Sequence, residues 1–132
     1  MKYFLFQYIM PWLCRMVKLF GTPGPLWRRR LKFIGPVTLK TEEGKKLKLF
    51  NKGFFLENEL FWLGLEGFDW EKISRKVWAE HCSKAQVILD IGANTGIFSV
   101  IAHTINPEAR IIAFEPQPNI FNVLKRNSSL NG

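Results

Sequence analysis

Cysteine is scarce in this chain, whose 132 residues include only Cys14 and Cys82. The two lie far apart and form no C-x-x-C pair, so the sequence indicates neither a disulfide framework nor a zinc site. Isolated thiols of this kind are typical of proteins kept in a reducing compartment. We therefore expect two reduced thiols, a cytoplasmic protein and no metal ion in its functional site.

A long uninterrupted hydrophobic run is also missing. Residues 1–20 are strongly apolar, but Gln7, Pro11, Arg15 and Lys18 interrupt them, whereas a membrane span needs about 20 apolar residues in succession. These four residues fall on one side of a helical wheel, which predicts an amphipathic helix over 1–20. A signal peptide is disfavoured, because no small-residue cleavage site follows the apolar run.

The apolar side of this predicted helix has two possible uses. It can pack on the rest of the protein, or it can lie on a membrane surface. Arg28, Arg29, Arg30 and Lys32 follow closely and would add attraction to anionic lipid. The sequence leaves both uses open, and peripheral membrane contact would involve residues 1–32.

Acidic residues are few in the first part of the chain. The net charge is +8, but residues 1–52 carry twelve Lys or Arg against two Glu, a charge of about +10. Residues 53–132 carry seven Lys or Arg against nine Asp or Glu, about −2. The basic character therefore belongs to the front of the chain. No nucleic-acid-reading motif accompanies it, so nucleic acid is not an expected partner.

Between the first helix and the last third of the chain we predict a linker and a hairpin. Residues 21–36 are rich in Gly, Pro and basic side chains, which favours a linker. Val37–Lys40 and Lys46–Phe50 are predicted strands joined by a Gly-containing loop. A helix is expected over 71–81, so the segment 37–84 consists of a hairpin and a helix that precede the core.

Lysines and aromatic residues crowd this middle segment. The lysines could contact phosphates or acidic lipids, but we prefer a solvated strand face that they protect from edge pairing. They are Lys40, Lys45, Lys46, Lys48 and Lys52. The aromatic side chains of residues 54–70 are expected to be core.

The last third, residues 85–132, carries the chemistry. Residues 86–89 form a short apolar run that suits a buried parallel strand, and 97–105 are predicted to be a helix that Asn106-Pro107 ends. A second strand over 110–114 and a second helix from Pro118 follow. This order predicts an α/β fold, an incomplete Rossmann-like, doubly wound parallel sheet. The second helix is expected to turn Ile120, Phe121 and Leu124 inward.

Polar residues and glycines follow both predicted strands, where ligands bind in such sheets. Asp90 ends the first strand, Gly92 can let a ligand approach the backbone closely, and Gly96 permits a tight entry into the helix. Asn94 or Thr95 can cap that helix. Glu115 ends the second strand, where a carboxylate can accept hydrogen bonds from both hydroxyls of a ribose.

Two common nucleotide-binding signatures are absent from this loop. It has the spacing G-x-x-x-G, so it lacks the full dinucleotide fingerprint, and no Lys-Ser/Thr pair of a phosphate-binding loop follows. Asp90 would repel a pyrophosphate but suits a ligand that carries an ammonium and a sulfonium. S-adenosylmethionine has both groups, a ribose and no phosphate.

The stretch Val87–Gly96, VILDIGANTG, resembles the first motif of FkbM-type methyltransferases. Ala113–Pro118, AFEPQP, resembles their next motif. Later residues continue the likeness, namely Phe121, Leu124, Asn127, Leu130 and Asn131. The resemblance covers about residues 85–132 and is weaker over 57–84.

This resemblance implies a Rossmann-like fold, S-adenosylmethionine as cofactor, and methyl transfer to a hydroxyl oxygen of a small molecule or glycan. Carried over by position, the residues that line the methionine end would be Asp90, Gly92, Ala93, Asn94 and Gly96, while Glu115 would hold the ribose.

In that family, later strands complete the sheet, the adenine pocket and the acceptor site. We therefore expect residues 85–132 to be the amino-terminal part of a methyltransferase domain, and the isolated chain to be inactive. No catalytic base is identified. Glu57, Glu59 or Glu71 could approach the site, although surface positions are the default for glutamate.

Two other functions compete with a methyltransferase. One is a membrane-associated binding module that uses the basic, aromatic amino terminus. The other is a nicotinamide-dependent oxidoreductase, which Asp90 and the missing glycine disfavour.

Overall fold

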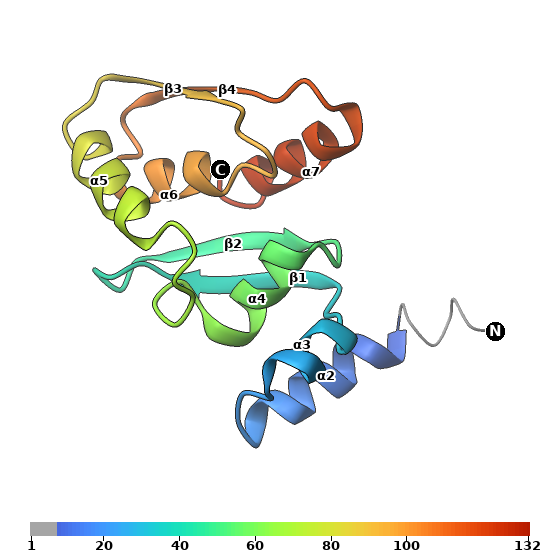
Figure 1. Ribbon diagram of the computed structural model, residues 1–132. Coiled ribbons are helices and arrows are strands. Elements are labelled where there is room, and N and C mark those ends of the chain that lie inside the picture. Colours follow the sequence, from blue (N-terminus) through green and yellow to red (C-terminus); the bar gives the residue numbers. More distant parts are fainter. Residues whose placement is uncertain (1–7) are drawn as a thin grey trace.

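The computed structural model describes residues 8–132 and shows a mixed α/β protein (Figure 1). Its elements in chain order are α2 (Met10–Leu19), α3 (Pro25–Arg30), β1 (Gly35–Lys40), β2 (Lys46–Asn51), α4 (Phe55–Leu63), α5 (Lys72–Cys82), β3 (Val87–Ile91), α6 (Ile97–Ile105), β4 (Arg110–Phe114) and α7 (Pro118–Ser129). The β3–β4 sheet lies at one end and the α2–α3 pair at the other, with α5–α7 and the hairpin between them.

The predicted hairpin is confirmed. β1 and β2 pair antiparallel, with Val37 opposite Leu49 and Leu39 opposite Leu47. Because side chains alternate along a strand, these four apolar residues share one face and are buried. The lysines fall mainly on the other face, as Lys40 opposite Lys46 illustrates, and are exposed.

The outer edge of β2 is covered by helix α7 rather than guarded only by lysines. The side-chain amide of Asn131 accepts a bond from the backbone N–H of Lys48 and donates one to its carbonyl, both at 2.8 Å. Asn127 accepts a bond from the N–H of Phe50 at 2.6 Å. These amides satisfy backbone groups that would otherwise form an open strand edge.

Helix α4 occupies a segment that we expected only to be core. Leu60, Phe61 and Trp62 are buried, and Phe61 stacks on Phe33 with ring centroids 4.1 Å apart. The helix shows no clear amphipathic period, because Glu57, Asn58 and Glu59 on its first turns are buried too. Gly64, with φ +73°, ends it.

Helix α5 forms as predicted, one residue later at each end, and anchors the loop before it. The Arg75 guanidinium is buried and donates to the carbonyls of Leu65, at 2.7 Å, Phe68, at 3.0 Å, and Trp70. Trp78 donates from its indole to the Phe98 carbonyl at 2.9 Å. Loop and helix are thus tied to each other and to α6.

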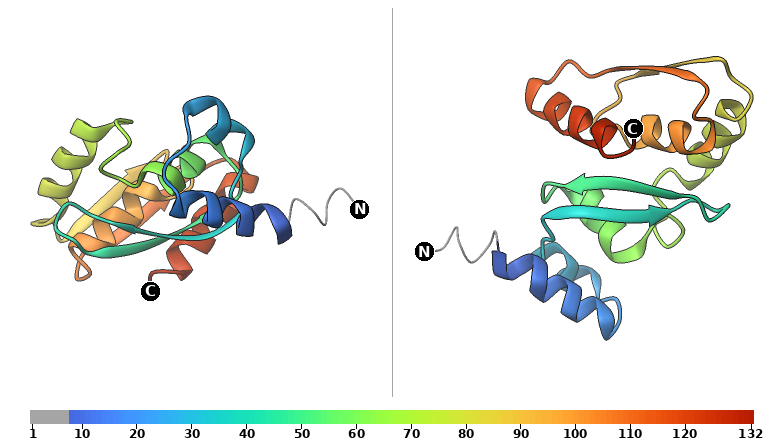
Figure 2. Two further views of the ribbon diagram at one scale, coloured as in Figure 1. Left: turned by 90° about the horizontal axis from the view of Figure 1, so that it is seen from below. Right: turned by 180° about the vertical axis from the view of Figure 1, so that it is seen from behind.

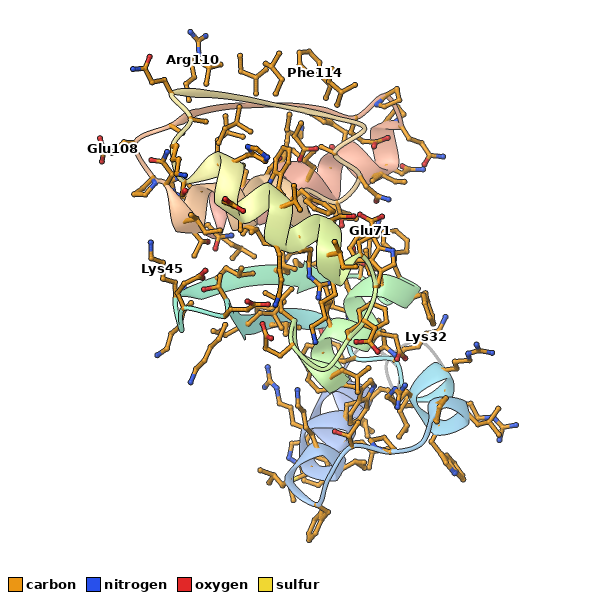
Figure 3. All side chains as sticks on the ribbon, turned by 60° about the vertical axis from the view of Figure 1, so that its left-hand side comes forward. Lys32, Lys45, Glu71, Glu108, Arg110 and Phe114 are labelled. Carbon is orange, nitrogen blue, oxygen red and sulfur yellow. The ribbon has the colours of Figure 1, made fainter. Side chains whose placement is uncertain are left out.

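The strand–helix–strand–helix order of the last third is confirmed. β3 and β4 pair in parallel, with Val87 opposite Arg110 and Ile91 opposite Phe114. Helices α6 and α7 lie on the same face of this two-stranded sheet (Figure 2). Arg110 and Phe114 point away from the helices (Figure 3), and Ile91 is 80% exposed. The double winding expected on both faces is therefore not present in the described residues.

The inner face of α7 differs from the prediction. Leu124 is buried as expected, but Val123 and Asn127 are its buried companions. Phe121 is exposed and Ile120 only half-buried. The buried side of the helix is therefore the one that carries Asn127, whose side chain bonds the hairpin edge.

The predicted amino-terminal helix is present as α2, while residues 1–7 of that prediction lie outside the described part. The predicted linker 21–36 contains the short helix α3.

Cys14 of α2 is fully buried, whereas Trp12 is 62% exposed. The interpretation in which this helix packs its apolar side on the protein is therefore wrong for residues 8–20. No helix among residues 8–132 has the length and apolar character needed to cross a membrane.

Candidate functional site

The glycine loop is fastened to the end of the neighbouring strand. The backbone N–H groups of Gly92 and Ala93 both donate to the Phe114 carbonyl, each at 2.9 Å. The N–H of Gly96 then donates to the Ala93 carbonyl at 2.8 Å, which closes the turn into α6. The loop after β3 and the end of β4 therefore form one rim, as expected for parallel strands whose carboxyl ends share an edge.

Glu115 sits on this rim and is held by two backbone groups. Its Oε2 accepts the N–H of Asn94 at 3.0 Å, and its Oε1 accepts the N–H of Gln117 at 2.9 Å. A carboxylate offers about four lone-pair sites, so two remain for a ligand. The carboxylate is thus fixed in direction and can still accept a pair of hydroxyls.

Asp90 was predicted to end the first strand; it lies inside β3, one residue before the end of the strand. It is buried, and its Oδ2 accepts a bond from the Ser99 hydroxyl at 2.5 Å. This bond ties the strand to the first turns of α6. Burial, with a smaller contribution from the Asp90 charge, raises the pKa of the Cys82 thiol to about 11.

The two glycines of the loop have different surroundings. Both have left-handed backbones, with φ +78° at Gly92 and +85° at Gly96. A Cβ on Gly92 would meet nothing within 4 Å, whereas one on Gly96 would lie 3.2 Å from Cγ of Leu124. Gly92 thus faces open space that a ligand can occupy, and Gly96 allows α6 and α7 to approach closely.

Neither predicted capping residue caps α6. The helix has no side-chain cap bond, and its first flanking residue is Gly96. Asn94 adopts φ +52°, a conformation that Asn tolerates better than most residues. Thr95 instead donates from its hydroxyl to Glu57 Oε1 at 2.5 Å.

Glu57 and Asn127 brace the loop from behind. Glu57 of α4 accepts the Thr95 hydroxyl, and Asn127 of α7 donates to the Thr95 carbonyl at 2.7 Å. Asn127 is fully buried and also accepts the N–H of Phe50. Helix α4, helix α7 and the hairpin therefore all fix the position of Thr95. Asn127 already stood in the family-like pattern of α7, but only the three-dimensional contacts show its role.

The three glutamates that could approach the site lie in different environments. Glu57 is buried behind the loop, and Glu59 is buried in an ion pair of 2.8 Å with Arg28. The expectation of surface positions is wrong for these two, because each has a specific buried partner. Glu71 is exposed and directly precedes α5, with φ +46°.

All six residues predicted to hold a cofactor lie along β3, its loop and the end of β4. They are Asp90, Gly92, Ala93, Asn94, Gly96 and Glu115. Their ligand-binding role stays a prediction. The rim is open, whereas a cavity of about 440 Å³ lies elsewhere, between the hairpin turn and α5. Among residues 8–132, no three His, Cys, Asp or Glu side chains are grouped to hold a metal ion.

Comparisons with known proteins confirm the resemblance to FkbM-type methyltransferases over part of the chain. The chain is 38% identical over 65 residues to methyltransferase sdnD of Sordaria araneosa, covering 45% of this chain and 25% of that protein. It is 43% identical over 42 residues to the 31-O-demethyl-FK506 methyltransferase FkbM of Streptomyces tacrolimicus, covering 32% of this chain and 16% of that protein.

The chain thus spans a quarter or less of the length of these relatives. No protein-family model matches it. No solved structure matches it either.

Proposed function

We propose that this chain binds S-adenosylmethionine and serves a methyltransferase that transfers the methyl group to a hydroxyl oxygen of a small molecule or glycan. One observation carries the proposal: the Glu115 carboxylate is fixed on the rim beside the open space at Gly92, and the buried carboxylate of Asp90 lies two residues before that glycine. The partial likeness to two methyltransferases supports it.

The residues present fit such a cofactor. Asp90 supplies negative charge for the ammonium and sulfonium end. Glu115, held by two N–H groups, retains the lone pairs that a ribose diol needs. The Asp90 charge would oppose a pyrophosphate.

When bound, the cofactor supplies an electrophilic methyl group on sulfur. The chain's own contribution is then to fix the donor, because in-line displacement depends mainly on the alignment of donor and acceptor. Asp90 would hold the charged end, Glu115 would orient the ribose, and the braced Thr95 would keep the loop between them in place.

We further propose that the β3–α6–β4–α7 unit is the start of a Rossmann-like, doubly wound sheet. Its parallel pairing and its ligand rim at the carboxyl ends support this. The exposed outer face, with Val87, Leu89 and Ile91 on β3, is the face that further helices cover in doubly wound folds.

Calorimetric titration of the whole chain with S-adenosylmethionine and with NAD tests the cofactor. We expect saturable binding of S-adenosylmethionine and no binding of NAD. Glu115→Gln should weaken binding about tenfold to a hundredfold, because a hydrogen bond to a charged group is worth roughly 1.5–3 kcal/mol.

The matched control is Glu108→Gln, which removes a charge from an exposed turn residue away from the rim (Figure 3). It should leave binding unchanged. Binding of NAD without S-adenosylmethionine, binding of neither, or equal losses in both variants would contradict the proposal.

A further inference from the structure

The outward side of α2 is apolar. The helix turns Cys14, Val17 and Lys18 toward the rest of the protein, where the Lys18 ammonium donates to the Phe61 carbonyl and lies 4.5 Å from the centre of its ring. The opposite side exposes large apolar residues by 36–89% of their surface. They are Tyr8, Ile9, Trp12, Leu13, Met16, Leu19 and Phe20.

Helix α3 extends this apolar surface. Leu26 and Trp27 are exposed by 77% and 60%. α2 and α3 lie side by side in the views of Figures 1 and 2, at the end of the molecule farthest from the β3–β4 sheet. We call the exposed residues of α2 and α3, together with the neighbouring basic side chains up to Lys32, the basal surface.

Charge on the basal surface has one sign. The first acidic residue of the chain is Glu42. Arg28 is engaged in its buried ion pair with Glu59, but Arg29, Arg30 and Lys32 are exposed. Cations thus border an apolar, tryptophan-bearing surface, with no carboxylate on either helix to offset them.

The combination of apolar side chains and positive charge distinguishes between two possible binding partners of the basal surface, a second copy of the chain and a membrane. A second copy of the basal surface would bring arginines of both copies together, and like charges across an interface oppose association. An anionic bilayer accepts both properties at once, because Trp favours the interface between headgroups and acyl chains and basic residues favour anionic headgroups.

We propose that the basal surface docks the protein on an anionic membrane, with Trp12 and Trp27 at the boundary of headgroups and acyl chains and Arg29 and Arg30 among the headgroups. The contact is peripheral, since no helix among residues 8–132 is long and apolar enough to cross a bilayer. It is independent of the proposed cofactor site, which lies at the other end of the molecule.

Flotation of the whole chain with phosphatidylcholine vesicles, with and without phosphatidylglycerol, tests this proposal. We expect binding that requires phosphatidylglycerol and weakens as salt is added. Arg29→Glu with Arg30→Glu should lower the partition coefficient at least tenfold, since each basic residue contributes about a fivefold preference for the anionic surface. Trp12→Ser with Trp27→Ser should lower it at least tenfold by removing apolar contact.

Matched controls change the same properties elsewhere. Lys40→Glu with Lys46→Glu makes the same change in net charge on the exposed hairpin face, and Ile73→Ser with Val77→Ser removes exposed apolar side chains from α5. Both should keep most of the binding. Brominated lipids should also quench the tryptophan fluorescence of the unmodified chain. This measurement detects contact with the bilayer without any substitution.

Several outcomes would overturn the proposal. These are no flotation with anionic vesicles, no quenching by brominated lipid, or losses in the controls as large as in the basal-surface variants. A dimer that forms without lipid and excludes vesicles would assign the basal surface to a second copy instead.

Discussion

At the scale of single residues, the glycine loop separates two kinds of glycine. Gly92 and Gly96 share a left-handed backbone but differ in what surrounds them. One faces open space and the other faces Leu124. Substitution of each glycine by alanine therefore distinguishes space that a ligand would occupy from space that is needed for helix packing.

Gly96→Ala should destabilise the fold by roughly 2–4 kcal/mol, from left-handed strain and from overpacking against Leu124. Gly92→Ala should cost only the strain, about 1–2 kcal/mol, but should reduce cofactor affinity more than its loss of stability explains. Urea unfolding with and without S-adenosylmethionine measures both. If Gly92→Ala retained full affinity for S-adenosylmethionine, the ligand would not occupy the open space at Gly92.

At the scale of elements, local patterns predicted the hairpin and the last third, but not the segments whose burial depends on distant partners. Leu39 and Leu47 alternate with lysines, and that alternation alone indicates which face is buried. Helix α4 has no such period, because Glu57 finds Thr95 thirty-eight positions later in the chain. Without knowledge of that partner, a buried glutamate cannot be predicted.

Helix α2 illustrates another limit. Its amphipathic pattern was correct, but a helical wheel does not say which side faces the protein. The side that faces inward carries Lys18, whose ammonium contacts the Phe61 carbonyl and ring, together with the core residues Cys14 and Val17. For the cofactor rim, the residue positions followed from the motif, whereas the bracing of Thr95 by Asn127 required the fold.

The loop between α4 and α5 depends on one guanidinium. Arg75→Met should destabilise the protein by roughly 2–5 kcal/mol, because it leaves the carbonyls of Leu65, Phe68 and Trp70 without their donors. Arg75→Lys should recover only part of this loss, since one ammonium cannot match the geometry of the guanidinium fork. Thermal unfolding of both variants checks the prediction. A Met variant as stable as the original chain would contradict it.

At the scale of the whole molecule, the two thiols lie in separate parts of the interior. Cys14 belongs to the larger hydrophobic cluster, with Phe33 and the hairpin leucines, and Cys82 belongs to the smaller cluster under β3. Burial raises the pKa of each thiol from 9.0 to about 11. Ionisation of either thiol therefore opposes folding.

Because both pKa values are higher in the folded state, this stabilisation is complete below about pH 9 and is lost as the pH rises toward 11. The free energy of unfolding should fall by about 2–3 kcal/mol per thiol across that window. Urea titrations at several pH values, compared with Cys14→Ala/Cys82→Ala, isolate the effect. The comparison cancels Lys18, whose pKa is lowered by burial and whose contribution has the opposite sign. Parallel pH profiles for both proteins would contradict the prediction.

Asn127 connects the hairpin to Thr95. The exchange rate of one backbone amide proton, that of Phe50, should therefore respond to changes in the glycine loop. The Phe50 N–H can exchange with solvent only when its bond to Asn127 opens, and the same side chain holds the Thr95 carbonyl. A ligand that orders the glycine loop should therefore slow hydrogen–deuterium exchange at Phe50, on a strand that the ligand itself does not touch. Exchange at Phe50 thus gives a readout of loop closure before any acceptor substrate is known.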